Sequence, residues 1–274
     1  TSLAAFTACV LVLMLAPPAE RPRPAAADPA RHTSGDFAAR PAPVELDLTD
    51  HPAYELPVPE PVDCSLPRVD AGSADSWVVF NDALSFCLTR LWRPRLEELG
   101  LRSVEPEFRV SRAAPEADGP LDESTLLAYY EGEPMAVTLV LPNVVRHARD
   151  LPADWEQSVW VSLLAHEYGH HVQQLAGILA AGSSQEREAP TDKERLQTRR
   201  RMELQAECLA GVAMQGLDGI GGTETGLVDE YLAYNLRTRT HGTGSNRSDW
   251  FHAGANHDSL GACNTYGAPP AQVE

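Results

Sequence analysis

Apolar side chains recur at helical spacing early in the folded part of the chain and predict an amphipathic helix over residues 76–92. Asp75 and Ser76 stand at its start, and both residue types cap helices by accepting a hydrogen bond from a backbone N–H. We expect the apolar face of this helix to pack in the core. Its apolar positions are Trp77, Phe80, Leu84, Leu88 and Leu91.

Three further helices are expected in the second half of the chain. The first covers residues 154–182, because Asp154 and Gln157 have the spacing of a capping box and a glycine can end the helix. The second covers residues 191–216 and again combines a capping box with a closing glycine. The third covers residues 225–237, and the Gly-, Asn- and Ser-rich residues that follow are expected to form an irregular tail.

Two short runs rich in Val, Thr and Leu predict β-strands over residues 107–111 and 136–141, each bounded by turns that contain proline. We expect both strands to belong to one small sheet. Together with the helices, this pattern predicts an α+β fold with a small sheet and a mainly helical second half.

The N-terminal residues have a different character. Residues 3–16 form an apolar run that is shorter than the roughly 18–20 residues a membrane span needs. Because the chain begins at Thr1 rather than Met, we interpret this run as the remainder of an export signal. Residues 28–61 are rich in Pro, Ala and charge without periodicity, which predicts a flexible spacer. The expected organisation is a signal peptide or N-terminal anchor (1–27), this spacer, and one folded domain (62–274).

The balance of charge narrows the range of partners. The chain contains 22 Lys and Arg against 39 Asp and Glu, for a net charge of −17. This charge opposes binding to phosphate backbones, so nucleic acid is not an expected partner. The export signal predicts a protein that is secreted or anchored on the outer face of the cell membrane. The sequence leaves the oligomeric state open.

Export also changes how the cysteines are interpreted, because an oxidising compartment permits disulfides. Cys64, Cys87, Cys208 and Cys263 allow three pairings. Neighbour order favours Cys64 with Cys87 and Cys208 with Cys263. The chain has no Cys-x-x-Cys pair, so a zinc knuckle built on cysteine is not expected.

The strongest chemical signal is the sequence His-Glu-Tyr-Gly-His at residues 166–170, inside an apolar helical segment. Residues four apart on a helix share a face, so the imidazoles of His166 and His170 can reach one metal ion. Glu167 lies between them and can accept a proton from a zinc-bound water, which makes it the candidate general base. This pattern predicts one catalytic Zn²⁺ per chain.

A catalytic zinc site needs a third protein ligand. The three-histidine form of the motif is excluded, because Gln173 and Ala176 stand where it requires Gly and His. Glu203 and Glu207 lie one helical turn apart on the next predicted helix. One of them can bind the metal while the other forms a hydrogen bond to a ligand histidine.

Three motifs occur in a recognisable order. Residues 165–173 read Ala-His-Glu-Tyr-Gly-His-His-Val-Gln, residues 203–208 read Glu-Leu-Gln-Ala-Glu-Cys, and residues 241–251 contain His-Gly-Thr, Arg and Trp-Phe. In these motifs the chain resembles the bacterial neutral zinc metallopeptidase family over roughly residues 130–265. The resemblance implies Glu203 as the third ligand, as in the Glu-x-x-x-Asp element of HtpX-type membrane peptidases.

The same resemblance implies a zincin-like domain that cleaves peptide or protein substrates. Two residues depart from the family pattern: Glu207 replaces Asp, and Asn246 replaces Gln. Peptide hydrolysis also needs a donor for the developing oxyanion. His241, Tyr234 and Arg247 are the candidates, and His241 is preferred because it opens the recurring block.

Two rival functions stay open. The first is a non-catalytic envelope protein that keeps zinc as a structural clamp, which a fourth protein ligand would favour. The second is a zinc hydrolase that acts on a non-peptide amide, for which the same constellation would serve.

Overall fold

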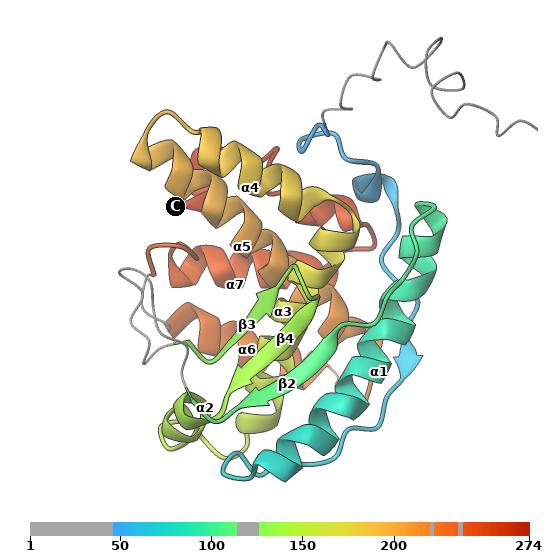
Figure 1. Cartoon of the computed structure of the whole chain (residues 1–274), viewed down its shortest axis with the longest axis vertical. Coiled ribbons are helices and arrows are strands. Elements are labelled where there is room, and N and C mark those ends of the chain that lie inside the picture. The colour runs from blue at the N-terminus through green and yellow to red at the C-terminus, as the bar shows by residue number, and fades with distance from the viewer. Residues whose placement is uncertain (1–45, 114–125, 220–221, 235–237) are drawn as a thin grey trace, which may run out of the picture. The chain divides into compact units, whose positions relative to one another are not determined.

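The computed structural model describes residues 46–113, 126–219, 222–234 and 238–274, which form a mostly helical α+β body (Figure 1). The helices are α1 (Ala74–Glu98), α2 (Leu141–Ala148), α3 (Glu156–Leu175), α4 (Ile178–Glu188), α5 (Asp192–Gly216), α6 (Gly222–Tyr234) and α7 (Gly244–Asn256). The strands are β1 (Val62–Asp63), β2 (Glu107–Ser111), β3 (Ala128–Glu131), β4 (Ala136–Val140) and β5 (Leu217–Asp218). Short 3-10 helices are η2 (Pro52–Glu55), η3 (Leu260–Cys263) and η4 (Pro270–Val273). The predicted α+β class is confirmed.

The main sheet has the order β2-β4-β3, in which β4 pairs parallel with β2 and antiparallel with β3. The two predicted strands are confirmed, and they are neighbours. β3 was not predicted. All five residues of the central strand β4 are buried. The sheet contacts α3 on one side, and α1 packs beside β2 (Figure 1).

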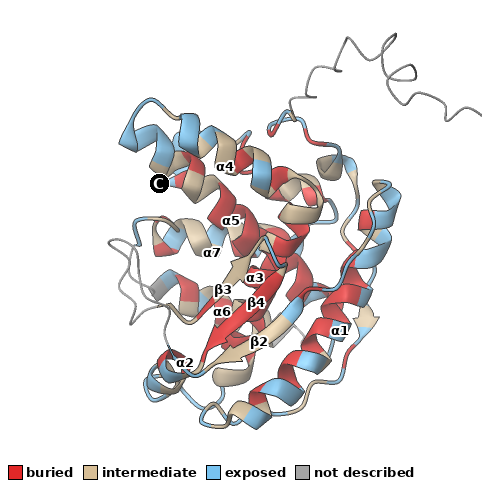
Figure 2. Ribbon diagram, viewed as in Figure 1, coloured by how far each residue is buried: buried red, intermediate tan, exposed pale blue. Residues whose placement is uncertain are grey.

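The first predicted helix is confirmed and extends beyond its expected ends. The predicted caps Asp75 and Ser76 are wrong, because Ser73 caps α1 by accepting a hydrogen bond from the backbone N–H of Ser76. All five predicted apolar positions are buried. Figure 2 shows the resulting stripe of buried residues along α1, facing the interior of the body.

The prediction of one helix over residues 154–182 is wrong. The helix breaks at Gly177, whose positive φ of 79° ends α3 and begins α4. The predicted capping box is also wrong, because Trp155 is the N-cap and the Gln157 side chain donates instead to the Pro67 carbonyl. Gly182, the expected stop, lies inside α4, where a side chain would collide with Tyr266 and Met202.

The capping box at the start of α5 is confirmed: the backbone N–H of Glu194 donates to Thr191 Oγ1. The irregular tail is a wrong prediction, because residues 244–256 form α7, which packs closely along α5. At Gly211 in α5 and Gly254 in α7, a side chain would collide with the backbone of the other helix. Predicted helix 225–237 corresponds to α6, and its last three residues lie outside the described residues.

Both predicted disulfides are present. Cys64–Cys87 joins the segment before α1 to that helix, and Cys208–Cys263 joins α5 to η3. Disulfides form and persist in oxidising compartments, which indicates an extracytoplasmic protein. None of the described helices combines the length and the apolar content that a membrane crossing requires.

Residues 46–61, the last part of the predicted spacer, contact the helical body. Leu48 is buried, and His51 Nε2 lies 3.2 Å from the Ala176 carbonyl at the end of α3. The backbone N–H of Val58 donates to the Asp258 carbonyl. The predicted signal segment and the remainder of the spacer lie outside the described residues.

Candidate metal centre

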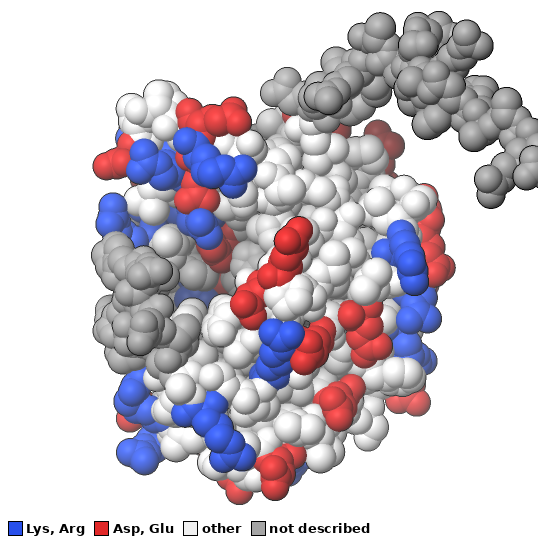
Figure 3. Space-filling view, viewed as in Figure 1, with Lys and Arg blue, Asp and Glu red and all other residues white. Residues whose placement is uncertain are grey.

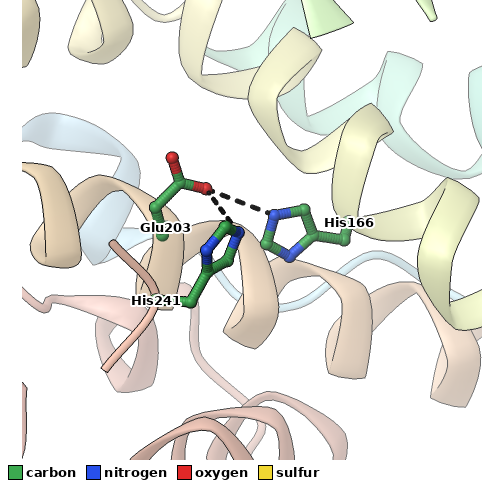
Figure 4. A group of neighbouring side chains, drawn as sticks. All are labelled: His166, Glu203 and His241. Carbon is green, nitrogen blue, oxygen red and sulfur yellow. Dashed lines mark ion pairs between the residues drawn. The ribbon is translucent and has the colours of Figure 1, made fainter. Parts of the chain in front are cut away.

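Three histidine side chains converge on one carboxylate oxygen. The Nε2 atoms of His166, His170 and His241 lie 3.5, 3.1 and 3.2 Å from Glu203 Oε2, respectively. Figure 4 shows His166 and His241 approaching Glu203 from different parts of the chain. His166 and His170 come from α3. Glu203 comes from α5, and His241 comes from the loop between α6 and α7.

Close packing of α3 against α5 brings these groups together. His166 and His170 are one helical turn apart, so both face α5. Between them stands Gly169, where an added Cβ would lie only 3.0 Å from the Ala206 carbonyl oxygen. The absence of a side chain at Gly169 therefore lets the two helices approach and places Glu203 within reach of both imidazoles.

The loop that carries His241 is held at several points. The backbone N–H of His241 donates to Thr238 Oγ1, and the N–H of Thr238 donates to the Gly242 carbonyl. Gly242 has a positive φ of 80°, which glycine adopts without strain. The His241 side chain is one-third exposed (33%), so this corner of the site is open to solvent.

The Nδ1 atom of each histidine also has a partner. His170 Nδ1 lies 2.9 Å from Gln173 Oε1, and His166 Nδ1 lies 3.7 Å from Glu207 Oε2. His241 Nδ1 lies 2.9 Å from the Thr240 hydroxyl. An amide or carboxylate oxygen at Nδ1 favours the tautomer with its lone pair on Nε2 in His170 and His166. The Thr240 hydroxyl can donate or accept, so His241 Nε2 can carry a proton.

The electrostatics of the cluster favour a cation beside Glu203. Burial opposes ionisation of Glu203, but the charges of His241 and His170 and the hydrogen bond from His166 hold its pKa well below the usual range. Burial likewise opposes the charged form of His166, yet hydrogen bonds to Glu203 and Glu207 outweigh burial and raise its pKa. The pocket therefore stabilises positive charge although it is buried.

Glu207 has a separate charge partner. Its Oε2 accepts a hydrogen bond of 2.9 Å from Arg247 Nε. Burial opposes ionisation, but Arg247 and His166 lower the pKa of Glu207 to about 2. Because Glu207 and Arg247 neutralise each other, Glu203 and Glu167 are the carboxylates left to balance a divalent cation.

The other oxygen of Glu203 faces a different residue. Arg199 Nη1 lies 3.8 Å from Glu203 Oε1, and Arg199 Nε lies 3.0 Å from Glu186. Figure 3 shows basic and acidic side chains side by side where α4 ends and α5 begins. This arrangement leaves Oε2 as the atom that the histidines share.

The donor set fits zinc. Imidazole nitrogens and a carboxylate oxygen are ordinary Zn²⁺ ligands, and such sites are tetrahedral. The ligand atoms of His166, Glu203 and His241 all lie within 4.8 Å of one another. His170 is outside this tightest group, but its Nε2 is the nearest of the three to Glu203 Oε2.

Glu167 is buried in α3 beside this cluster. Burial raises the pKa of its carboxyl, while the charges of His166 and His170 oppose that shift. A carboxyl with a raised pKa is suited to accept and return a proton. The predicted base is therefore buried in α3, next to His166 in the sequence, and its role stays a prediction.

The other predicted oxyanion donors are placed differently. Arg247 is engaged with Glu207, and the side chain of Tyr234 lies outside the described residues. His171, adjacent to the motif, is fully buried, with its ring nitrogens near the Val104 carbonyl and the Tyr130 hydroxyl. These contacts join the segment before β2 and the strand β3 to α3.

Known proteins resemble parts of this chain in sequence. "Uncharacterized protein YpfJ" of Escherichia coli (strain K12) is 27% identical over 197 residues, which cover 64% of this chain and 67% of that protein. "Uncharacterized protein Rv2575" of Mycobacterium tuberculosis (strain H37Rv) is 29% identical over 133 residues, covering 39% of this chain and 43% of that protein. No solved structure matches the chain. Residues 147–235, which contain α3 and α5, match the family described as "Putative neutral zinc metallopeptidase", and the chain is similar to that family over these residues.

Proposed function

We propose that this protein is an exported zinc-dependent peptidase, a metalloendopeptidase, in which His166, His170 and Glu203 bind one Zn²⁺. Glu167 is the general base, and His241 stabilises the oxyanion. The observation that carries the proposal is the convergence of imidazole Nε2 atoms on Glu203 Oε2 beside a buried second carboxylate. A purely structural zinc site has no use for that second carboxylate.

The residues divide the chemistry of peptide hydrolysis among them. Bound zinc supplies a polarised carbonyl and a water acidic enough to lose a proton near neutral pH. Glu167 accepts that proton as the water oxygen adds to the carbonyl carbon, and it returns the proton to the amine nitrogen when the C–N bond breaks. His241 donates from Nε2 to the carbonyl oxygen as negative charge develops there. Glu207 orients His166 through its contact with the Nδ1 atom of that ring.

A zincin-like arrangement would also explain how a peptide is held. In the described part of the chain, β3 is an edge strand with β4 on one side. The hydroxyl of Tyr130 in β3 lies 3.0 Å from His171 Nδ1, which fastens this edge to the helix of the metal motif. An exposed strand edge can pair with the main chain of an extended peptide. The expected substrate is therefore an extended segment of peptide or protein, met outside the cytoplasm.

Metal analysis combined with a broad peptide-library digest tests the proposal. We expect about one zinc per chain, cleavage of library peptides, loss of cleavage after chelation, and recovery on adding Zn²⁺. Cleavage of a cell-wall amide with all peptides left intact would instead identify a hydrolase of non-peptide amides.

A second candidate function is a structural zinc clamp, and the position of His241 favours it. If His241 Nε2 binds the metal, four protein groups close the site and no position is left for water. Under our proposal, His241→Ala keeps zinc and lowers kcat about 10²–10³-fold, as loss of an oxyanion donor does. His170→Ala serves as the comparator and is expected to lose zinc. Zinc loss of equal size in both variants, without hydrolysis in the parent protein, would establish the clamp.

A further inference from the structure

Two glutamines form a buried chain of hydrogen bonds that begins at the Nδ1 atom of His170. Gln173 and Gln205 are 0% and 1% exposed. Gln173 Oε1 lies 2.9 Å from His170 Nδ1, and Gln173 Nε2 donates to Gln205 Oε1 at 2.9 Å. Neither side chain faces the shared oxygen of the cluster, so neither is a metal ligand.

Backbone carbonyls determine how both amides point. Gln173 Nε2 lies 2.9 Å from the Met202 carbonyl, which can only accept, so the NH₂ group must face Met202. The Gln173 carbonyl oxygen then faces His170 Nδ1, and that nitrogen must carry the proton. The lone pair of His170 is thereby placed on Nε2, the atom that faces Glu203.

The amide of Gln205 is oriented in the same way. Its Nε2 donates to the Cys263 carbonyl at 3.1 Å and to the Tyr54 hydroxyl at 2.8 Å, so its oxygen faces Gln173. The Tyr54 hydroxyl in turn donates to the Leu48 carbonyl. Every donor in this hydrogen-bond network has an acceptor. The outermost acceptor, the Leu48 carbonyl, lies in the segment that leads into η2.

We propose that Gln173 and Gln205 are positioning residues that preset the tautomer and ring orientation of His170 for metal binding, with Tyr54 as the outer anchor. The proposal rests on the metal site of the proposed function. A neutral amide suits this role because Glu203 and Glu167 already supply negative charge nearby, while Glu207 is paired with Arg247. It orients the imidazole without adding a fourth carboxylate.

Zinc affinity, measured by competition with a chelator on the full chain, tests the proposal. We expect Gln173→Leu to weaken zinc binding about 10–100-fold, the usual effect of removing a partner of a ligand histidine. Gln174→Leu makes the same chemical change at the next, half-buried position and is expected to leave affinity unchanged. Gln205→Leu and Tyr54→Phe are expected to give progressively smaller losses, since each leaves the inner contacts in place.

A second measurement separates positioning from general loss of stability. The Nδ1–H resonance of His170 in the zinc-loaded protein reports its hydrogen bond, and we expect it to shift in Gln173→Leu and in Gln205→Leu but not in Gln174→Leu. If Gln173→Leu does not fold, the Gln205 and Tyr54 variants carry the test. Unchanged affinity and an unchanged resonance would overturn the proposal. Weakened zinc binding in a protein that cleaves no peptide would support it while overturning the proposed function.

Discussion

Glu167→Gln is expected to abolish most hydrolysis while the protein still binds about one zinc per chain. The substitution keeps the size of the side chain but removes the group that accepts the proton from water. General acid–base groups contribute about 10²–10⁴-fold to rate, so we expect kcat to fall within that range. Zinc content should persist, because the groups that converge on Glu203 Oε2 are unchanged.

Zinc content by elemental analysis and initial rates on a cleaved library peptide measure the two halves of this expectation. Glu156→Gln is a matched control, because it makes the same change in the first turn of α3, far from the metal motif. Full activity in Glu167→Gln would show that another group is the base. Loss of zinc together with activity would show that Glu167 is a ligand.

Local sequence signals predicted the elements whose ends are set locally. The strands predicted at residues 107–111 and 136–141, found at 107–111 and 136–140, and the cap at Thr191 were of this kind. The break between α3 and α4 was not, because the sequence pattern predicts Gly182 as the stop rather than Gly177, another glycine five residues earlier. Gly177 takes the positive φ, whereas Gly182 packs against side chains from distant parts of the chain. Tertiary packing therefore decided between two equivalent local signals.

Helix α7 was missed for a related reason. Residues 244–256 are rich in Gly, Asn and Ser, which have low helix propensity and form no apolar stripe. The helix is stabilised by its contact with α5, where Gly254 lies against the backbone at Cys208. That contact joins residues far apart in the chain and leaves no local pattern.

In the candidate site, too, some features follow from local spacing and others depend on distant residues. The spacing of His166 and His170 directly predicted two imidazoles on one helical face. The choice between Glu203 and Glu207 was not predictable from spacing, because both lie on one face of α5. In the structure Arg247, which is distant in sequence, pairs with Glu207, and this pairing favours Glu203 as the ligand that we propose. The hydrogen-bonding role of Gln173 was likewise hidden, although the residue belongs to the recurring motif.

Substitution of the two α5 glutamates tests which one completes the metal site. We expect Glu203→Gln to lose most of the zinc affinity, because Glu203 Oε2 is the atom on which the histidines converge. Glu207→Gln is expected to weaken affinity about 10–100-fold by removing the acceptor behind His166. The Glu207→Gln substitution also leaves the Arg247 charge without its partner. The free energy of unfolding of this variant should therefore fall as well.

Glu207→Asp is the control that keeps the charge. It shortens the side chain by one methylene and can still accept from Arg247, so we expect a smaller loss of zinc affinity than in Glu207→Gln. Chelator competition gives the affinities, and denaturant unfolding of the metal-free proteins separates stability from binding. Zinc lost in Glu207→Gln and kept in Glu203→Gln would move the ligand role one helical turn along α5. In that case Arg247 would compete with the metal for Glu207 Oε2, and removing Arg247 should then strengthen zinc binding rather than weaken it.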